Sequence, residues 1–250
     1  MKKERIDKLL IERGLADSLS KAQALIMAGV VLADEQRVEK PSQQFLPSVF
    51  VRLKNDKAEN RYVGRGGLKL EKALSDFQIN VSGLVCLDVG ASTGGFTDCL
   101  LQHKARKVVA VDAGFNQIDW KLRTDARVEV RENVNARFLK PDDFEQKFDL
   151  IVIDVSFISV TKIFLAIAPL LDEKGKIIVL IKPQFEVRRG EVEPGGIVRD
   201  AEKHCRVIVE VNQSALANDL QNLELIDSPI LGANGNKEFL ALYAKSSQNT

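Results

Sequence analysis

The second part of the sequence alternates short apolar segments with stretches of helical spacing. From residue 84 onward, seven segments of strand length are rich in Val, Ile and Leu: 84–89, 107–112, 127–130, 148–155, 175–182, 223–230 and 238–245. Between them, the periodicity predicts helices over 94–103, 115–123, 158–171 and 200–218. Apolar strands that alternate with helices are buried on both faces of a sheet. The pattern therefore predicts an α/β fold, a doubly wound and mainly parallel sheet of seven strands.

The first 45 residues have a different pattern, typical of a helix, a turn, a second helix and short strands. Ile6, Leu9, Leu10 and Arg13 share one helical face, and Gly14 is a plausible end of that helix. We expect the second helix to begin at Ser18 or Ser20, to carry Ala24, Leu25 and Met27, and to end at Gly29. The segment "GVVLADEQRVEKPS" then predicts a hairpin with "ADEQ" at its tip.

The polar, basic segment between these two patterns is interpreted as a linker, with the boundary near residues 54–63. We therefore expect two domains. The first is a small α+β module with its linker (1–60), and the second is the α/β body (64–250).

Composition adds to this picture only through the uneven distribution of charged residues along the chain. The net charge is +1, but residues 1–75 hold 15 Lys and Arg against 10 Asp and Glu, which leaves 21 against 25 for the rest. A basic front on a mildly acidic body is typical of a nucleic-acid-binding module attached to an enzyme, although a solvated charged surface explains it equally well.

The cysteines and the apolar runs indicate the cellular compartment in which the protein is expected. Three cysteines without a CxxC pair and two distant histidines predict neither a metal site nor a disulfide framework, and favour a reducing cytoplasm. There is no signal-peptide pattern, and no run reaches the ~18 apolar residues of a membrane span. We expect a soluble, cytoplasmic protein.

The stretch "DVGASTGG" at residues 88–95 is a glycine loop between a predicted strand and a predicted helix. It lacks the Gly-Lys-Ser/Thr ending of a phosphate-binding loop and the GxGxxG spacing of a dinucleotide site. Gly90 permits a sharp turn, and Gly94 with Gly95 lets the backbone approach a ligand. Asp112 ends the next strand, where a carboxylate can accept both hydroxyls of a ribose, and Asp88 suits a cationic group. The loop favours S-adenosylmethionine, with a dinucleotide as the alternative.

Two charged residues follow later strands. Asp154 ends "LIVID" and Lys182 ends "IIVLI", and in open α/β sheets such positions face the ligand crevice. A lysine after a fully apolar strand is costly to bury unless it is paired or used. Lys69 and Glu238 are further candidates for such roles, although each position by itself is typical of an ordinary surface charge.

The front segment resembles the S-four RNA-binding domain in the spacing of the following residues: Arg5, Asp7 to Leu10, Gly14 to Ala16, Ser20 to Ala22, Leu25-Ile26, Gly29 to Val31 and Val38 to Pro41. The resemblance implies binding to structured RNA, with Arg5, Lys8, Ser20 and Lys21 as candidate contacts, mostly to phosphate and 2′-hydroxyl groups. Leu19 stands where family members often carry a basic residue. Arg65 is a further candidate for RNA contact.

The whole chain resembles the TlyA family, known both as haemolysins and as ribosomal-RNA methyltransferases. Five motifs carry the resemblance in order: "GRGGLKLEKAL", "DVGASTGGFTDCLL", "DLIVIDVSFISV", "LIKPQFE" and "KEFLAL". The body is similar to FtsJ-type ribose 2′-O-methyltransferases, whose Lys-Asp-Lys-Glu tetrad falls on Lys69, Asp154, Lys182 and Glu238. Cofactor-binding positions are then expected at Asp88, Gly90, Ser92, Gly94, Phe96, Asp112, Asp154 and Asn135, with Asn133 as an alternative to Asn135. The "STGG" stretch departs from the proline common in FtsJ-type loops.

Ribose methylation would give these residues definite tasks. A 2′-hydroxyl must be aimed at the methyl group and relieved of its proton, so Lys182 is expected either to orient the hydroxyl or to act as base. The "DVSF" motif lacks the two prolines that base-amino methyltransferases tend to place there, which favours oxygen over nitrogen as the acceptor.

These features predict an S-adenosylmethionine-dependent methyltransferase that modifies a ribose 2′-hydroxyl of ribosomal RNA, with cytidine implied by the resemblance. Ribosomal RNA or subunits are the expected partners, no membrane contact or metal is expected, and the oligomeric state stays open. The alternatives are a membrane-active haemolysin and an RNA-binding protein with a decayed site. The long segment 182–200 is either a substrate clamp or a surface loop.

Overall fold

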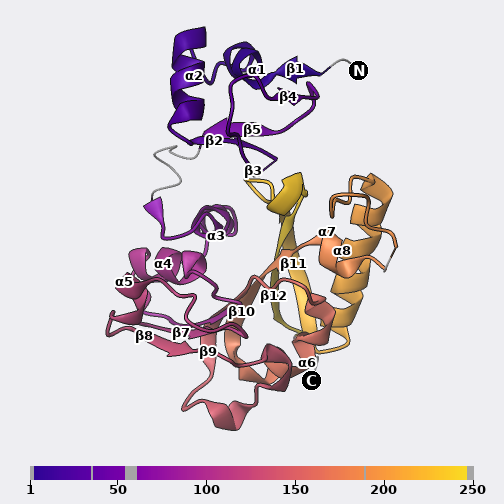
Figure 1. The fold of residues 1–250 in the computed structure, drawn as a ribbon. Helices are drawn as coiled ribbons and strands as arrows, with labels where there is room; N and C mark the ends of the chain where they lie inside the picture. The colour runs from indigo at the N-terminus through magenta and orange to yellow at the C-terminus, as the bar shows by residue number, and fades with distance from the viewer. Residues whose placement is uncertain (1–2, 35, 54–60, 189, 247–250) are drawn as a thin grey trace. The chain divides into compact units, whose positions relative to one another are not determined.

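The computed structural model describes residues 3–34, 36–53, 61–188 and 190–246 (Figure 1). The chain divides into two compact units. One comprises residues 1–60 with the segment 233–235, and the other comprises residues 61–232 and 236–250. Most of the linker predicted near 54–63 falls on residues 54–60, which lie outside the described residues. The predicted domain boundary thus stays a prediction.

Within its described residues, the first unit contains two helices and five short strands: β1 (Glu4–Arg5), α1 (Ile6–Glu12), α2 (Leu19–Met27), β2 (Val31–Ala33), β3 (Gln36–Arg37), β4 (Gln44–Phe45) and β5 (Val51–Leu53). Strands β3, β2 and β5 form one antiparallel sheet, and β1 pairs with β4. The predicted hairpin is confirmed, since Leu32 pairs with Arg37 and Ala33 with Gln36.

Helix α2 begins at one of the two predicted caps and contains the three residues predicted for it. The Ser18 side chain caps it by accepting a hydrogen bond from the Lys21 N–H at 3.2 Å. Its buried residues are Ala22 and Ile26, whereas Met27 is 71% exposed. A short helix over a small core buries only a narrow stripe.

The second unit is built on one seven-stranded sheet: β6 (Val85–Val89), β7 (Lys107–Val111), β8 (Val128–Arg131), β9 (Phe148–Ile153), β10 (Leu171–Ile181), β11 (Leu220–Asp227) and β12 (Phe239–Lys245). The strand order is β11-β12-β10-β9-β6-β7-β8. Strand β12 runs antiparallel to both of its neighbours, and the five strands from β10 to β8 pair in parallel. All seven predicted strands are confirmed.

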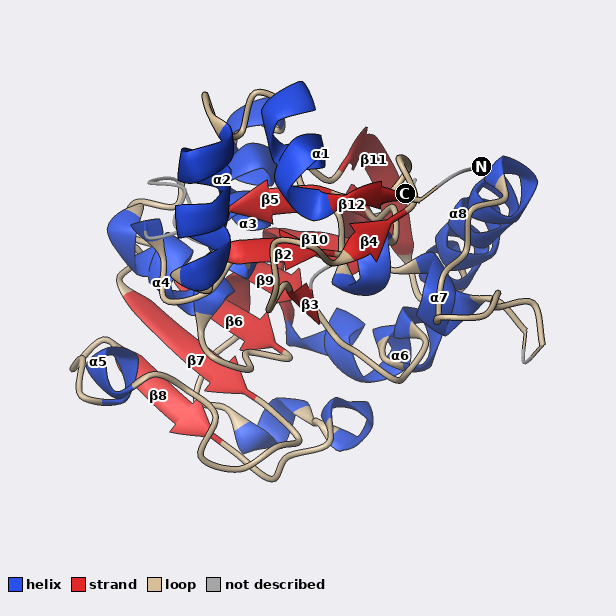
Figure 2. Cartoon of the chain, turned by 45° about the horizontal axis from the view of Figure 1, so that its top comes forward, coloured by secondary structure: helices blue, strands red, loops and turns tan. Residues whose placement is uncertain are grey.

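Helices cover both faces of this sheet (Figure 2). The helices are α3 (Gly66–Asp76), α4 (Gly95–Gln102), α5 (Trp120–Arg123), α6 (Phe164–Ile167), α7 (Pro183–Glu186) and α8 (Ala201–Leu216), with short 3₁₀ turns η2 (Ala136–Phe138), η3 (Pro141–Asp143), η4 (Val160–Lys162) and η5 (Ala168–Leu170). A further 3₁₀ turn, η6 (Ala233–Gly235), belongs to the first unit. One core cluster packs α6 and α8 against the sheet, and the other packs α3, α4 and α5. These two cores hold the strand ends in fixed positions.

Two predicted helices are shorter than the periodicity indicated. The helix expected over 115–123 is only α5, because Asn116 has a φ of +55° and the Asp119 side chain caps Lys121 N–H at 2.9 Å. The helix expected over 158–171 is broken into η4, α6 and η5, since Pro169 has no N–H to continue the ladder.

Candidate functional site

The glycine loop joins β6 to α4 at the edge of the sheet where the parallel strands end. Gly90 (φ +85°) and Gly94 (φ +98°) adopt conformations that other residues rarely take. A Cβ on Gly90 would lie 2.3 Å from the Asp154 carbonyl oxygen, and one on Gly94 would lie 2.1 Å from Leu122 Cδ1. The two glycines therefore allow the loop to pass directly against the ends of β9 and α5.

A cavity of about 1000 Å³ opens beside this loop. Its lining includes most of the predicted cofactor positions that follow strand ends: Gly90, Ser92, Asp112, Asn135 and Asp154. The Asp112 carboxylate accepts the Ser92 N–H at 2.8 Å and the Gly114 N–H at 2.6 Å. Asp112 thus fixes the loop and still presents free lone pairs to the cavity, because each carboxylate oxygen can accept more than one hydrogen bond.

A smaller cavity of about 200 Å³ shares part of this wall. It is lined by the segment 64–66, by Phe96 and by Lys182. Gly90, Ser92, Asp154 and Ser156 line both cavities. A group bound in the larger cavity and a group bound in the smaller one would therefore meet at this shared wall, where Asp154 and Ser156 supply the polar side chains next to Lys182.

The four predicted tetrad residues form two lysine–carboxylate pairs. Lys182 Nζ lies 2.5 Å from Asp154 Oδ1, and Lys69 Nζ lies 2.5 Å from Glu238 Oε2. Gln184 connects them, because it follows Lys182 by two residues and its Nε2 donates to Glu238 Oε1 at 3.5 Å. The structure thus brings together four residues that are up to 169 positions apart in the sequence.

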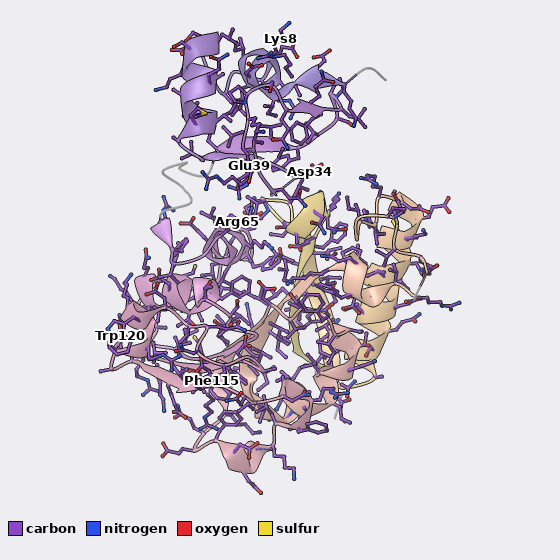
Figure 3. All side chains as sticks on the ribbon, in the orientation of Figure 1. Lys8, Asp34, Glu39, Arg65, Phe115 and Trp120 are labelled. Atoms are coloured by element: carbon purple, nitrogen blue, oxygen red, sulfur yellow. The ribbon has the colours of Figure 1, made fainter. Side chains whose placement is uncertain are left out.

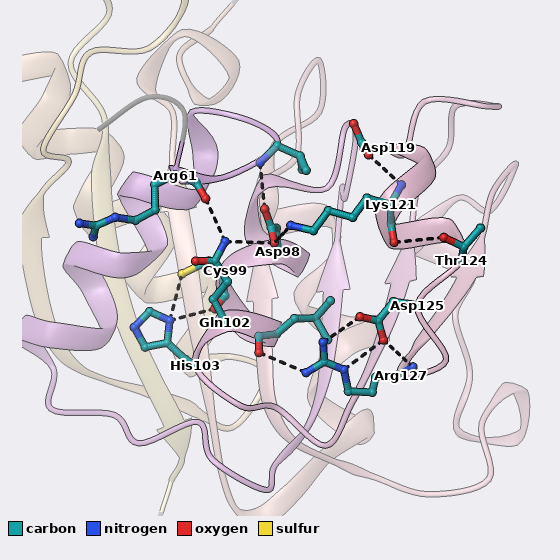
Figure 4. A network of polar contacts seen from close by, with 12 residues as sticks. Arg61, Asp98, Cys99, Gln102, His103, Asp119, Lys121, Thr124, Asp125 and Arg127 are labelled. Atoms are coloured by element: carbon teal, nitrogen blue, oxygen red, sulfur yellow. Dashed lines mark hydrogen bonds and ion pairs between the residues drawn. The ribbon is translucent and has the colours of Figure 1, made fainter. Parts of the chain in front are cut away.

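Helix α3 places Lys69, and the segment before α3 is held by α4 (Figure 4). The Asp98 carboxylate is almost fully buried and accepts hydrogen bonds from Val63 N–H at 2.9 Å and Gln102 Nε2 at 3.2 Å. Gln102 Nε2 also donates to the Arg61 carbonyl at 2.9 Å. The chain therefore enters α3 along a fixed path, and Lys69 projects from the buried face of this helix.

Asp88 does not line either cavity, contrary to the expectation that it faces a cationic ligand. It is fully buried on β6 and accepts a hydrogen bond from Thr97 Oγ1 at 2.6 Å, while its Oδ1 has no partner. Burial raises the pKa of Asp88 to about 7. The alternation of side chains along β6 turns Asp88 toward α4, because Val89 and Leu87 face the opposite core.

The other predicted cofactor positions differ in exposure. Phe96 is 3% exposed and forms part of the wall beneath Gly66. Asn135 is exposed, lines the larger cavity and accepts the Arg137 N–H at 3.1 Å. Asn133, the alternative, has a φ of +58° and is absent from the described lining of that cavity.

The predicted RNA contacts of the first unit lie on its surface. Lys8, Ser20 and Lys21 are exposed, and Figure 3 shows Lys8 on α1. Arg5 is also exposed, but its guanidinium is bound to the fully buried Asp7 at 2.6 Å. Arg65, in contrast, belongs to the second unit and lines the smaller cavity.

Sequence reasoning missed three contributors near Lys182. The Ser156 hydroxyl accepts a hydrogen bond from Lys182 Nζ at 2.9 Å. Phe157 is 92% exposed at the rim, with its ring centroid 5.1 Å from that of Phe185. Glu186 binds the Ser159 hydroxyl at 2.5 Å and the Val160 N–H at 2.9 Å. The motifs "DVSFISV" and "KPQFE" contain all three, but their spacing does not reveal which side chains meet.

The long segment after α7 is attached to the body. Glu193 pairs with Ile197, and the Asn236 side chain accepts the Val198 N–H at 3.0 Å and donates to the Gly196 carbonyl at 2.8 Å. These bonds tie the segment to the turn that precedes Glu238. Its predicted role as a clamp stays a prediction.

Comparisons with known proteins agree with this geometry. Residues 62–245 match the model of the FtsJ-like methyltransferases, and residues 4–51 match the S4 (S-four) domain. The rRNA (cytidine-2′-O)-methyltransferase TlyA of Mycobacterium tuberculosis, named for both 16S and 23S rRNA, is 40% identical over 95% of this chain and 88% of its own length.

Two further relatives are more similar in sequence. YqxC of Bacillus subtilis, named as a candidate rRNA methyltransferase, is 45% identical over 96% of this chain and 85% of its own length. A Streptococcus thermophilus protein of solved structure that carries the name hemolysin is 43% identical, covers 99% of this chain and 90% of its own, and has a TM-score of 0.77. The chain therefore belongs to the TlyA family, methyltransferases in which an S4 domain precedes an FtsJ-like catalytic body.

Proposed function

We propose that this protein uses S-adenosylmethionine to methylate a ribose 2′-hydroxyl of cytidine in ribosomal RNA, and that it does so in the cytoplasm. One observation carries the proposal: the pair Lys182–Asp154 lies beside the glycine loop, where Asp154 lines both cavities, and Gln184 connects it to the buried pair Lys69–Glu238. The family gives the reaction class, and the names of the TlyA relatives supply the acceptor.

The larger cavity fits the proposed methyl donor. Asp112 would hold the ribose hydroxyls, and Asn135 lies on the wall where the adenine would be bound. Gly90 lines this cavity, and its missing side chain lets the loop pass against the Asp154 backbone at the cavity wall. When bound there, S-adenosylmethionine supplies an electrophilic methyl group on a positively charged sulfur.

Lys182 then acts on the acceptor. Asp154 stabilises the positive charge of the ammonium group, so we assign Lys182 the task of donating a hydrogen bond to the acceptor hydroxyl and aiming it. Lys69 and Glu238 form the buried pair behind it, and Gln184 links that pair to the Lys182 segment. This arrangement assigns orientation to Lys182 in preference to proton abstraction. The acceptor oxygen would bond to the methyl carbon as the methyl–sulfur bond breaks, and the proton of the hydroxyl would pass to the Asp154 carboxylate, which lines both cavities, or to solvent.

The first unit would hold the RNA. Lys8 and Lys21 are exposed cations suited to phosphate groups, and such contacts set position more than sequence. A ribose within folded RNA would have to be turned out of its stack, which costs a few kcal/mol. The exposed ring of Phe157 at the cavity rim offers a stacking face for the displaced base.

The test is nucleoside mass spectrometry. Unmodified 16S and 23S rRNA, and both ribosomal subunits, are incubated with the protein and labelled S-adenosylmethionine. We expect label in 2′-O-methylcytidine. Label on a base would overturn the assignment of oxygen as the acceptor, and label in another 2′-O-methylnucleoside would overturn the assignment of cytidine.

Because some relatives are named hemolysins, the experiment includes a test for membrane activity. No helix in the described part of the chain is long and apolar enough to cross a membrane. Purified protein is therefore added to dye-loaded liposomes without the methyl donor. Stoichiometric release of dye, together with no methyl transfer to any RNA, would replace the proposed function with a membrane activity.

A further inference from the structure

Ser156 is an exposed serine that touches the proposed catalytic lysine and has no assigned task. We propose that Ser156 is a positioning residue for Lys182. Its hydroxyl holds one N–H of the ammonium group, so that the other N–H bonds keep fixed directions and one of them is aimed at the acceptor hydroxyl. The inference rests on the proposed function and names a further residue of the same site.

The argument begins with the number of donors on Lys182. An ammonium group has three N–H bonds and no acceptor. Ser156 Oγ accepts one of them at 2.9 Å. Asp154 Oδ1 lies 2.5 Å from Nζ as the ion-pair partner, but outside the angles of a hydrogen bond. The centroid of the Phe185 ring is 5.8 Å away, at the outer limit of a cation–π contact, and does not occupy a further direction as a hydrogen-bond acceptor would.

Ser156 lies at a place where the direction of the Lys182 N–H bonds would affect the reaction. Ser156 and Asp154 line both the larger and the smaller cavity, and Lys182 lines the smaller one. The N–H of Lys182 that Ser156 binds is thus fixed beside both cavities. Because the three N–H bonds rotate together about the Cε–Nζ bond, this hydrogen bond also sets the directions of the other two, whereas the ion pair with Asp154 alone leaves that rotation free.

The loop that carries Ser156 is held firmly enough for such a task. At its start, the Asp154 N–H donates to the Val89 carbonyl at 2.9 Å. At its end, Glu186 binds both Ser159 and Val160. Phe157 adopts a φ of +63°, a strained conformation for a residue with a Cβ, and residues in such conformations persist where surrounding contacts determine them.

Loss of the hydroxyl should therefore affect the chemical step more than binding. Ser156→Ala leaves the Lys182–Asp154 pair in place but frees the ammonium group to rotate, so fewer bound acceptors are aimed correctly. A hydrogen bond to a charged group corresponds to a fall in kcat of roughly 10- to 50-fold. The exposure of Ser156 makes the variant safe for folding.

The experiment compares Ser156→Ala, Ser156→Thr and the wild type on rRNA that the wild type methylates. Ser82→Ala is the matched control, because Ser82 is exposed and absent from the described linings of both cavities. We expect the roughly 10- to 50-fold fall in kcat for Ser156→Ala, recovery of most of it in Ser156→Thr, and no change in Ser82→Ala. KM for rRNA and the calorimetric Kd for S-adenosylmethionine should be unchanged.

The outcomes separate this inference from the proposed function. Wild-type kcat in Ser156→Ala would overturn the inference and leave the proposed function intact. A fall in kcat that accompanies weaker binding of rRNA or cofactor, without rescue by Thr, would also overturn it, because Ser156 would then be a binding residue. If the wild type transfers no methyl group to rRNA, the proposed function fails and the inference fails with it.

Discussion

The two lysine–carboxylate pairs of the body have the same chemistry but different surroundings. Both have a nitrogen–oxygen distance of 2.5 Å. In the pair Lys69–Glu238 the side chains are 10% and 2% exposed, and neither residue is part of the described lining of the two cavities. In the pair Lys182–Asp154 they are 11% and 20% exposed, and both line the smaller cavity.

Because their surroundings differ, we expect the two lysine–carboxylate pairs to have different roles. A buried ion pair costs desolvation energy that its attraction only partly offsets, so removal of one partner leaves an expensive unpaired charge. A pair that borders a cavity can exchange its partner for water or for a substrate. We therefore expect Lys69–Glu238 to contribute mainly to the integrity of the site, and Lys182–Asp154 mainly to the reaction.

The largest effect is expected when Lys182 is replaced. Lys182→Ala removes the donor that aims the acceptor, and methyl transfer should fall at least about 100-fold. Lys174→Ala is the matched control, since Lys174 is an exposed lysine on β10, the strand that Lys182 directly follows. Transfer of labelled methyl to rRNA is the measurement, and equal activity of the two variants would contradict the assignment.

The second largest effect is expected on the free energy of unfolding, when the carboxylate of either pair is replaced by an amide. Glu238→Gln leaves Lys69 buried without a counter-charge, and the free energy of unfolding should fall by about 3–5 kcal/mol. Asp154→Asn should cost less than about 2 kcal/mol, because water in the cavity can solvate Lys182. Urea unfolding followed by circular dichroism measures both. Equal losses would show that the two pairs do not differ as proposed.

Asp88 extends the comparison to a buried carboxylate with no lysine. Its pKa is raised to about 7 by burial, from an unfolded value near 3.8. The neutral form therefore stabilises the folded protein below pH 4, and this contribution is lost as the pH rises through the window from about 4 to about 7. Asp88→Asn removes the titrating group and keeps an acceptor for Thr97.

The unfolding free energy of Asp88→Asn relative to wild type should consequently increase with pH across that window, by about 4 kcal/mol at most, and level off above it. Unfolding curves from pH 4 to pH 8 measure this difference. A difference that does not vary with pH would show that Asp88 is ionised in the folded protein throughout.

The smallest effects are expected in the first unit, where the ion pair Arg5–Asp7 has one exposed partner. Lys8→Ala and Lys21→Ala should each reduce the slope of log Kd for rRNA against log salt concentration by about 1. Arg5→Ala should change it less, because the Arg5 charge is already compensated by Asp7. Filter binding at several salt concentrations tests this order, and a larger effect of Arg5 would reverse it.

The strands of the body could be predicted because their composition reflects burial on both faces. "VCLDV", "KVVAV" and "FDLIVI" are apolar irrespective of side-chain direction, and all three are strands of the central sheet. The positions of Asp154 and Lys182 followed from the rule that strand ends meet at one edge. Lys69 and Glu238 required the family resemblance, since each precedes or begins an element that alone reads as ordinary surface.

The remaining features depend on side-chain direction, which periodicity does not give. Asp88 precedes the glycine loop as a ligand-binding carboxylate would, but its place on β6 turns it toward Thr97. Ser156 and Glu186 act through contacts between two loops, and such contacts arise only when both strands are in register. Helix α7 also escaped prediction, because four residues contain no measurable period.

The antiparallel direction of β12 has a consequence for the synthesis of the protein. Because β12 runs against β10, its first residue lies at the edge where β10 ends, and this direction delivers Glu238 to Lys69. Lys69, Asp154 and Lys182 leave the ribosome well before Glu238 does. A growing chain therefore acquires its S4 domain, residues 4–51, first, and Glu238 as the last residue of the proposed tetrad. A newborn chain is expected to hold RNA before it is able to modify it.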